Sequence, residues 1–421
     1  MTISECYVYI TLPGETSMVT AGRFRLEASA GSNEGRGAFV YGKSYLARKN
    51  AVEIDPRELT FANGTKNSFR QNGVFGALRD AGPDSWGRRL IERQMMNAGL
   101  SEIDYLLKSP DDRAGALGFG LNVEPPSPLM QFNRTIDLPD LIRLANEVMS
   151  ANELKQDDDR LQVERLVKAG TSMGGMRPKA TVDADGVLWL AKFPLERDRW
   201  NNPRVEHATL TLARQCGIRT VESDVRTIGD RDVLFVRRFD REAVNGGYTR
   251  KRMISGLTML AADEAHDDRW SYVALAEEMR RFAPTAISQQ LRELFSRMCF
   301  SCLVSNLDDH PRNHAFIADN QGWQLSPAYD ITPTPSISVA SRDLAMTIGS
   351  HGRWANRGNL ISQSARFGID STEAASLIDE MKEQVEQTWY STFRSAGVSE
   401  TDCELVRSAF VYEGFGYEPF F

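Results

Sequence analysis

The sequence has few cysteines and no long apolar run. Its five cysteines are scattered over 421 residues, and an odd, scattered set does not form a disulfide framework. No stretch approaches the roughly 18 consecutive apolar residues that a membrane-spanning helix needs, and the first residues lack the basic start and apolar core of a signal peptide. We therefore expect neither a disulfide-stapled secreted domain nor a membrane protein, but a protein of the reducing cytoplasm.

An excess of positive charge is missing as well. The chain carries 50 Lys and Arg against 57 Asp and Glu, a formal net charge of −7. An acidic surface argues against nonspecific binding of nucleic acids or membranes by the chain alone. Hydrophobic residues make up 41% and charged residues 25%, a globular composition that provides for a sizeable core. The length allows two or three domains.

The motifs of common hydrolases are also absent. There is no G-x-S-x-G nucleophile elbow. His310 and His314 are four apart, but the glutamate of the H-E-x-x-H zinc motif is not there. Cys299 and Cys302 form a C-x-x-C inside residues 291–304, a stretch whose apolar residues predict a buried helix. Without a second cysteine pair or a flanking histidine, this pattern favours two core thiols over a metal or redox site.

Strand-forming residues dominate the first part of the chain. Residues 1 to about 75 contain runs of β-formers separated by Gly and Asn clusters, which predict strands and turns. A helix is expected at about 84–98, and the helical spacing of apolar residues predicts another at 138–150. The proline-rich residues 125–128 lie between these two helices and mark a candidate domain boundary.

A second sheet and a helical region follow. Strands are predicted at 179–182 and 186–193, a helix at 205–216, and two further strands at 221–227 and 233–239. Beyond about residue 263 the pattern is mostly helical. A small β-rich lobe followed by a larger helical lobe is an α+β, bilobal arrangement.

The strongest chemical signal is the stretch S-N-L-D-D-H-P-R-N at 305–313. Asp308 and Asn313 are five apart, the interval between aspartate and asparagine in the catalytic loop of protein kinases. That chemistry needs a carboxylate to accept the proton of the substrate hydroxyl and a neutral oxygen nearby to bind Mg²⁺. Asp308 is therefore the predicted catalytic residue. Asp309 is an alternative without the five-residue interval, and a polar capping loop is the purely structural interpretation.

A second aspartate supports this interpretation. Asp330 follows Asn313 by 17 residues, within L-S-P-A-Y-D-I. Apolar residues and a proline flank it, as they do the metal-binding aspartate of a D-F-G segment. Asn313 and Asp330 are thus predicted to hold Mg²⁺, which prefers oxygen ligands. A turn aspartate before a strand is the alternative.

Lys192 lies in the apolar stretch L-W-L-A-K-F-P, where a lysine is costly unless it is paired. Kinases place such a lysine on the ATP phosphates, and Glu206 on the next predicted helix is a candidate partner. The glycine-rich residues 169–179 precede this strand and can approach phosphates with backbone N–H groups, although they match neither common phosphate-loop pattern. An edge-strand lysine and a flexible loop are the alternatives.

In their order along the chain, these segments resemble the HipA family of serine/threonine kinase toxins of type II toxin–antitoxin systems. The segments that carry the resemblance are A-G-P-D-S-W-G-R at 81–88, D-R-A-G-A-L-G-F at 112–119, G-M-R-P-K at 175–179, V-R-R-F-D-R at 236–241, and residues 306–313 with 328–331. Each segment is a weak signal, but the ordered set is specific and covers most of the chain.

The resemblance implies a protein-kinase-like fold and assigns roles to residues. The implied parts are a β-rich N-terminal subdomain at 1–125, a kinase N-lobe at 126–240 and an all-helical C-lobe at 241–421. Asp308 would accept the proton, Asn313 and Asp330 would hold Mg²⁺, and Lys192 would bind the phosphates of ATP. The other implied nucleotide-binding positions are Ser172, Gly174, Gly175, Met176, Arg177 and Lys179 in the glycine-rich loop, Arg237, Arg238 and Phe239 in the hinge, and His310 and Tyr329.

Ser172 occupies the position of the serine that the family autophosphorylates, with Thr171 as a competing acceptor. A phosphate adds nearly two negative charges beside the ATP phosphates, so self-inactivation is expected. Two residues depart from the family pattern. Arg237 stands where glutamate is frequent, and Asp309 replaces an arginine of some members, which places a second carboxylate beside Asp308 that should couple to it.

The resemblance also implies partners. The protein substrate would be a translation factor such as an aminoacyl-tRNA synthetase. A small, HipB-like helix-turn-helix antitoxin would restrain the toxin and supply the DNA contacts. Two other classes stay open: an adenylyltransferase or small-molecule kinase on the same fold, and a pseudokinase that only binds nucleotide, because a fold alone does not establish an activity.

Overall fold

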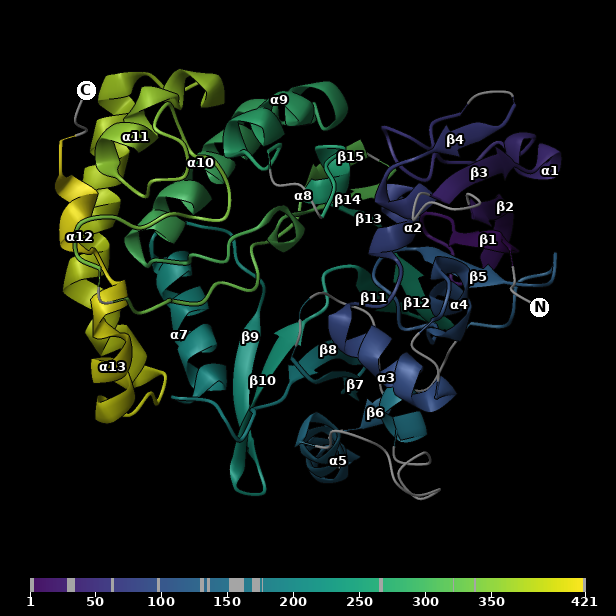
Figure 1. Cartoon of the computed structure of the whole chain (residues 1–421), viewed down its shortest axis with the longest axis horizontal. Coiled ribbons are helices and arrows are strands. Elements are labelled where there is room, and N and C mark those ends of the chain that lie inside the picture. Colours follow the sequence, from purple (N-terminus) through teal and green to yellow (C-terminus); the bar gives the residue numbers. More distant parts are fainter. Residues whose placement is uncertain are drawn as a thin grey trace. The chain divides into compact units, whose positions relative to one another are not determined.

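The computed structural model describes most of the chain (Figure 1). The described residues are 4–28, 35–61, 64–96, 99–128, 132–134, 137–150, 163–168, 175, 177–264, 268–320, 322–336 and 338–418. The chain forms two compact units: the first from Met1–Glu196, Phe235–Asp263 and Ile317–Gln321, and the second from Arg197–Leu234, Glu264–Phe316 and Gly322–Phe421. The predicted divisions at residues 125 and 240 do not coincide with these boundaries, and the three-part division remains a prediction.

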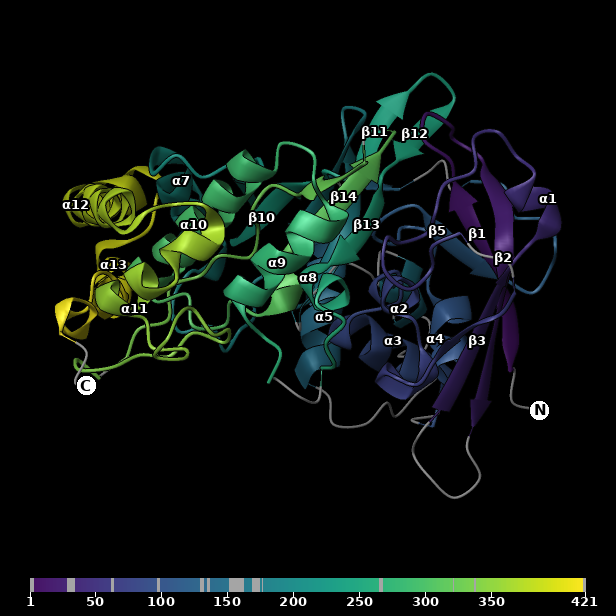
Figure 2. The ribbon, with the colours of Figure 1, turned by 90° about the horizontal axis from the view of Figure 1, so that it is seen from above.

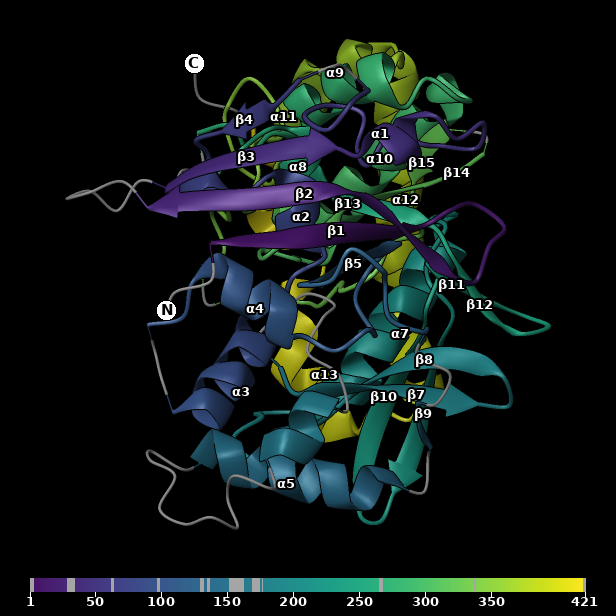
Figure 3. The same ribbon diagram turned by 90° about the vertical axis from the view of Figure 1, so that its right-hand side faces the viewer.

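An antiparallel sheet forms the N-terminal part of the first unit, in the region where the β-formers predicted strands. Its strands are β1 (Glu5–Thr11), β2 (Met18–Ala28), β3 (Gly35–Tyr41), β4 (Lys66–Ser68) and β5 (Leu117–Gly120), in the order β4-β3-β2-β1-β5. Figure 3 shows β1, β2 and β3 side by side. Phe24 and Phe39 both pack edge-on against Phe75, so the sheet has an aromatic core on one face.

Short helices accompany this sheet. They are α1 (Lys43–Leu46), α2 (Gly76–Asp80), α3 (Ser85–Met95) and α4 (Glu102–Lys108). The prediction of a helix at about 84–98 is confirmed by α3. Asp84 is its N-cap and accepts the N–H of Gly87 at 2.8 Å, which satisfies a donor that the first turn of a helix leaves free. α4 begins with a capping box between Ser101 and Asp104.

The first unit continues with β6 (Asn133–Arg134), α5 (Leu138–Ser150), β7 (Lys179–Ala184) and β8 (Val187–Lys192). The predicted helix at 138–150 and the predicted strand pair are confirmed. β7 and β8 form an antiparallel hairpin, and its turn residues Asp185 and Gly186 both have positive φ, 55° and 77°. Such a turn matches the right-handed twist of the strands it joins.

The prediction of an all-helical segment at 241–421 is wrong. It contains β11 (Arg241–Val244), β12 (Gly247–Arg250), β13 (Arg252–Ser255), β14 (Ala315–Asp319) and β15 (Gly322–Leu325), besides the short helix α8 (Gly256–Met259). β11 and β12 are joined by the two residues Asn245-Gly246. Asn-Gly is the strongest local signal for a tight hairpin, and the helical pattern that follows it obscured this signal.

The second unit is largely helical. Its elements are α7 (Asn202–Gln215), β9 (Ser223–Ile228), the first part of β10 (Arg231–Arg237), α9 (Tyr272–Phe282), α10 (Ile287–Leu303), α11 (Arg357–Ser362), α12 (Ser371–Ser395) and α13 (Glu400–Val406). Figure 2 shows α12 beside α7, α10 and α11, and it packs against all three. The long helix α10 leads directly into the predicted catalytic loop.

α10 is buried along most of its length. Cys299 and Cys302 lie inside it as fully buried free thiols, and burial raises the pKa of both. The interpretation of this C-x-x-C as two core thiols is confirmed. Among the helices that the structure describes, none combines the length and apolar character that crossing a bilayer requires.

Candidate active site

The predicted catalytic loop begins where α10 ends. Val304 is the C-cap of the helix, and Ser305 has a left-handed backbone with φ of 50°. The N–H of Asn306 returns to the carbonyl of Ser301 at 2.8 Å, which closes the helix and turns the chain. The loop ends in a 3₁₀ turn at Pro311–Asn313 before β14. The interval between Asp308 and Asn313 therefore lies in one short loop between a buried helix and a strand.

Asp309 is fully engaged in this loop and almost completely buried. Its Oδ2 accepts hydrogen bonds from the hydroxyls of Tyr272 and of Ser301, the latter at 2.8 Å. Its Oδ1 lies 3.1 Å from Nε2 of His314. Burial alone would raise the pKa of Asp309, but His314, Tyr272 and Ser301 outweigh it and lower the pKa. Asp309 thus fastens the loop to α9 and α10.

Asp308 is the carboxylate that the loop presents to solvent. Although its side chain is exposed, partial desolvation raises its pKa; the charges of Asp330 and Asp309 add to this rise, and His310 opposes it. A carboxylate with a raised pKa is a better proton acceptor than an ordinary one. The two adjacent carboxylates therefore differ in environment: Asp308 is exposed and Asp309 is buried.

Asn313 and Asp330 complete the predicted metal-binding pair. Nδ2 of Asn313 donates to the carbonyl of Asp308 at 3.0 Å, so the side-chain oxygen is the part left to face a cation. Asp330 has a left-handed backbone with φ of 58°, a conformation that costs a non-glycine residue energy and is frequent at functional sites. Its charge raises the pKa of Asp308, and the N–H of Thr332 donates to Oδ1 of Asn306 at 3.3 Å, so the two predicted segments lie side by side.

The segment before Asp330 is held by the backbone. The N–H of Ala328 donates to the carbonyl of Arg219 at 2.8 Å, and the carbonyl of Ala328 accepts the N–H of Val221 at 2.9 Å. The hydroxyl of Tyr329 donates to the carbonyl of Arg312 at 2.8 Å. Tyr329 therefore links the metal segment to the catalytic loop; a contact between its side chain and nucleotide stays a prediction.

His310 lies between Asp308 and an aromatic neighbour. Its ring stands edge-on to Trp270, with centroids 6.3 Å apart. Nδ1 of His310 is buried and finds no hydrogen-bond partner among the residues that the structure describes. Buried polar atoms are nearly always paired in native structures. An unpaired nitrogen beside the catalytic loop fits a site that a ligand completes.

The chemistry of the donors also fits Mg²⁺. Within the residues that the structure describes, no three His, Cys, Asp or Glu side chains are arranged to hold a metal ion. A cation at Asn313 and Asp330 would therefore draw its remaining oxygens from phosphate and water. Mg²⁺ is usually bound in this way, by one or two carboxylates together with substrate phosphates.

The predicted phosphate-binding lysines belong to the first unit. Lys192 ends β8 and is the cross-strand partner of Lys179 on β7, so both side chains point to the same face of the hairpin. The ammonium of Lys179 is almost completely buried and pairs with Asp84, the N-cap of α3. Because Asp84 neutralises Lys179, the two lysines can lie opposite one another. Glu206 lies in the second unit, and its pairing with Lys192 remains a prediction.

The glycine-rich loop is described only in part. Gly175 has φ of 100°, a value that favours glycine, and its carbonyl accepts from Nζ of Lys179 at 3.3 Å. Arg177 is half-exposed. Ser172, Gly174 and Met176, like Thr171, lie outside the described residues, and their predicted roles stay predictions.

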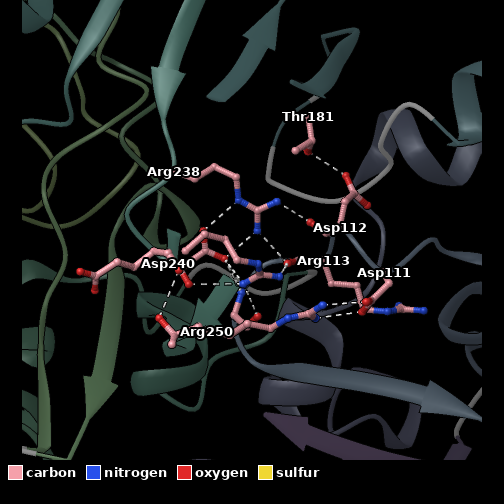
Figure 4. A network of polar contacts seen from close by, with 11 residues as sticks. Asp111, Asp112, Arg113, Thr181, Arg238, Asp240 and Arg250 are labelled. Atoms are coloured by element: carbon pink, nitrogen blue, oxygen red, sulfur yellow. Dashed lines mark hydrogen bonds and ion pairs between the residues drawn. The ribbon is translucent and has the colours of Figure 1, made fainter. Parts of the chain in front are cut away.

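The hinge residue Arg238 directs its guanidinium toward protein groups, and its predicted place in the nucleotide-binding hinge stays a prediction. Figure 4 shows its guanidinium between Asp240 and the chain around Asp112 and Arg113. It donates to both carboxylate oxygens of Asp240, at 2.9 and 2.7 Å, and to the carbonyls of Asp112 and Arg113, at 2.6 and 2.9 Å. Since all its donors face protein groups and the side chain is fully buried, Arg238 holds the hinge in place. Arg237 is exposed and Phe239 half-buried.

Residues 171–389 match the family model described as the HipA-like C-terminal domain, and these residues are more than half of the chain. The chain belongs to the HipA-like family. HipA of Shewanella oneidensis, solved as a complex with HipB and operator DNA, superposes with a TM-score of 0.67 at 17% identity over 95% of this chain and 94% of that chain. The HipA-like chain therefore shares the fold of that protein over nearly its whole length.

Two further relatives are more distant. A Haemophilus influenzae protein named "Putative kinase" is 24% identical over 200 residues, 42% of this chain and 57% of that protein, so the match spans little more than half of this relative. The Helicobacter pylori proinflammatory kinase CtkA overlaps with a TM-score of 0.40 at 12% identity, over 58% of this chain and 92% of that one. An overlap of that size is too low to indicate a common fold.

In this HipA-like chain, sequence reasoning missed the residues that join two of the family segments. Asp240 accepts the N–H of Gly115 at 2.8 Å, and Arg241 donates to the carbonyls of Arg113 and Gly115, both at 2.6 Å. Segment 112–119 and segment 236–241 thus form one buried cluster. The signal was present, because each segment carries Asp and Arg among apolar residues, where charges are costly unless paired.

Proposed function

We propose that this chain is a Mg-ATP-dependent serine/threonine protein kinase of the HipA toxin type, with Asp308 as its catalytic residue. The observation that carries the proposal is the difference in burial and pKa between the two adjacent carboxylates, Asp308 and Asp309. Asp309 is buried and fastened, while Asp308 is exposed, has a raised pKa and lies within electrostatic reach of Asp330. A kinase needs one such carboxylate next to its metal ligands.

In this mechanism Asp308 accepts the proton of a serine or threonine hydroxyl as the hydroxyl oxygen attacks the terminal phosphorus of ATP and ADP leaves. Asn313 and Asp330 would hold Mg²⁺, which when bound neutralises charge on the phosphates. Lys192 would bind the α- and β-phosphates, and His310 would lie near the γ-phosphate. Asn313 also keeps Asp308 in place through its bond to the Asp308 carbonyl.

The test is intact mass after incubation with Mg-ATP, wild type beside Asp308→Ala. A product heavier by one phosphoryl group, formed only by the wild type, supports the kinase. A gain of one AMP moiety would instead indicate adenylyl transfer. No mass gain on the chain or on any candidate acceptor, with nucleotide binding retained, would indicate a pseudokinase. Mapping the modified residue tests Ser172 against Thr171.

We further propose a small, HipB-like helix-turn-helix antitoxin as partner, with an aminoacyl-tRNA synthetase or similar translation factor as substrate, in the cytoplasm. The complex of S. oneidensis HipA with HipB and operator DNA supports a partner of this kind. The net charge of −7 fits DNA contacts that come from the partner. A mobility-shift assay should show operator binding by the pair, and little binding by this chain alone.

A further inference from the structure

Residues 409–411, in the C-terminal segment, lie against the entrance of the catalytic loop. The carbonyl of Leu303, the last residue of α10, accepts the N–H of Val411 at 2.7 Å. The hydroxyl of Ser305 donates to the carbonyl of Ala409 at 2.6 Å, 104 residues further along the chain. The last carbonyls of a helix lack partners within the helix. Here Val411 supplies such a partner to the carbonyl of Leu303, five residues before Asp308. Ala409 accepts from the hydroxyl of Ser305, three residues before Asp308.

Arg342 also links the entrance of the catalytic loop to the C-terminal segment. Its guanidinium donates to the hydroxyl of Ser305 and to the carbonyls of Ser408, at 2.7 Å, and Ala409, at 3.3 Å. It also stacks over the ring of Tyr412, 4.5 Å from the centroid. A single buried side chain therefore joins the entrance of the catalytic loop to the C-terminal segment.

The C-terminal segment is itself anchored to the long loop that follows the metal segment. Nδ2 of Asn356 lies within hydrogen-bond distance of the carbonyls of Gly414, Phe415 and Tyr417, at 3.1, 3.1 and 2.8 Å. The hydroxyl of Tyr412 donates to the carbonyl of Ala355 at 2.6 Å. The N–H of Gly414 donates to the carbonyl of Val339 at 2.8 Å. These hydrogen bonds would break if the C-terminal segment moved away from residues 339–356.

Backbone conformation marks the junction as constrained. Ser305 and Val411 both have left-handed backbones, with φ of 50° and 42°. This conformation is unfavourable for any residue with a Cβ and most of all for a β-branched one. It persists only where the surrounding contacts impose it. Both constrained residues belong to the contact between the loop entrance and the C-terminal segment.

We infer that residues 408–417, the C-terminal strap, position the catalytic loop for phosphoryl transfer. Ser305, Arg342 and Asn356 are its positioning residues and touch no reacting atom. The inference rests on the proposed kinase function for its effect on rate. Misplacing a reacting group by about 1 Å can cost about 100-fold in rate, so a small shift at Ser305 is enough to matter at Asp308.

Two glycines of the strap provide a matched pair of variants. A Cβ added at Gly414 would lie 2.0 Å from the carbonyl oxygen of Ala340, which is backbone and cannot rotate away. A Cβ added at Gly416 meets nothing within 4 Å. Neither glycine has a positive φ. Gly414→Ala should therefore displace the strap, and Gly416→Ala should leave it in place.

The experiment measures kcat and KM for ATP in the full-length chain, together with amide hydrogen exchange of Asn306, Asp309 and His310. We expect Gly414→Ala to lower kcat about 10- to 100-fold, with KM for ATP unchanged and faster exchange at these amides. Gly416→Ala should match the wild type in each respect. Ser305→Ala removes the link on the loop side without a clash; it should act in the same direction, and it decides the matter if Gly414→Ala does not fold.

Equal kcat and equal amide exchange in Gly414→Ala, Ser305→Ala and Gly416→Ala would refute the positioning role of the C-terminal strap. Failure of the proposed function looks different, because the wild type itself would then transfer no phosphoryl group. Exchange at the loop amides still tests the strap in that case. Faster exchange in Gly414→Ala than in Gly416→Ala would support its hold on the loop, and equal exchange would refute it.

Discussion

Two buried aspartates organise the two units in different ways. Asp240 in the first unit accepts from Arg238, from Arg241 and from the N–H of Gly115, which lies 125 residues away in sequence. Burial alone would raise the pKa of Asp240, but the two guanidiniums outweigh it and hold the pKa well below its usual range. Asp240 therefore depends on permanent cations and joins distant parts of the chain.

Asp309 in the second unit has partners of another kind. Two are hydroxyls, from Tyr272 and Ser301, and the third is the ring of His314. All three come from within 37 residues of Asp309. We therefore expect Asp240, with its arginines, to matter chiefly for the stability of the first unit. We expect Asp309, with its hydroxyls and histidine, to matter chiefly for the position of the catalytic loop. The predictions below test that difference.

The largest effect is expected at the exposed neighbour of Asp309. Asp308→Asn removes the proposed proton acceptor and should lower kcat by about 10²–10⁴-fold. Its thermal midpoint should not fall, because the carboxylate it loses is repelled by Asp330. Steady-state kinetics beside thermal unfolding checks both parts. Wild-type turnover by Asp308→Asn would remove Asp308 from the chemistry.

The next largest effect concerns the first unit. Asp240→Asn leaves Arg238 and Arg241 buried without their carboxylate, and breaking a buried pair in this way costs about 3–5 kcal/mol. Asp379→Asn is the matched control, since Asp379 also receives two bonds from one guanidinium, that of Arg357, but the two side chains are 36% (Arg357) and 53% (Asp379) exposed. The control should cost about 1 kcal/mol or less. Urea unfolding measures the free energy of unfolding of both variants. Similar losses would show that the buried cluster around Asp240 contributes no more to stability than an exposed ion pair does.

Asp309→Asn should lower the free energy of unfolding less than Asp240→Asn does, but it should displace the catalytic loop. The amide that replaces the carboxylate can still accept hydrogen bonds but carries no charge. The loss per bond is therefore only the difference between a bond to a charged acceptor, about 1.5–3 kcal/mol, and a bond to a neutral one, about 0.5–1.5 kcal/mol. We expect lower stability than the wild type, a reduced kcat and an unchanged KM for ATP. Ser301→Ala, which removes one neutral donor, should cost about 1 kcal/mol. If Asp309→Asn left kcat untouched, the positioning role of Asp309 would be wrong.

The sequence located what depends on local spacing. The apolar period of residues 138–150 predicted α5, and the interval between Asp308 and Asn313 lies in a loop that also meets Asp330. That interval alone favours Asp308 over Asp309 as the catalytic residue. Local patterns of this kind are visible because neighbouring residues determine them.

What the sequence could not provide depends on partners far along the chain. Tyr272 is 37 residues from Asp309, and Asp112 is 126 residues from Arg238, so neither pairing has a local pattern. The bonds of the Arg238 guanidinium to Asp240 and to the carbonyl of Asp112 were therefore not predicted. The hairpin at Asn245-Gly246 is different, since its turn signal is local and can be recognised in the sequence.

The smallest effect separates the two aspartates by pH. Because the pKa of Asp309 is lowered in the native state, the unfolded chain binds more protons than the native chain below about pH 4, and stability rises with pH there. The contribution of Asp309 to stability is complete above the pKa of the unfolded chain and is lost as pH falls through the native pKa, by at most about 1.4 kcal/mol per pH unit.

The same sign holds for Asp240, whose pKa is held well below its usual range, so its contribution to stability is lost only under strongly acidic conditions. During acidification, protection from exchange, taken relative to the intrinsic rate at each pH, should therefore fall first at the Asp309 amide and later at the Gly115 amide. Asp309→Asn should remove that early step while leaving Gly115 unaffected. Simultaneous loss at both amides would mean that one network, not two, holds the chain together.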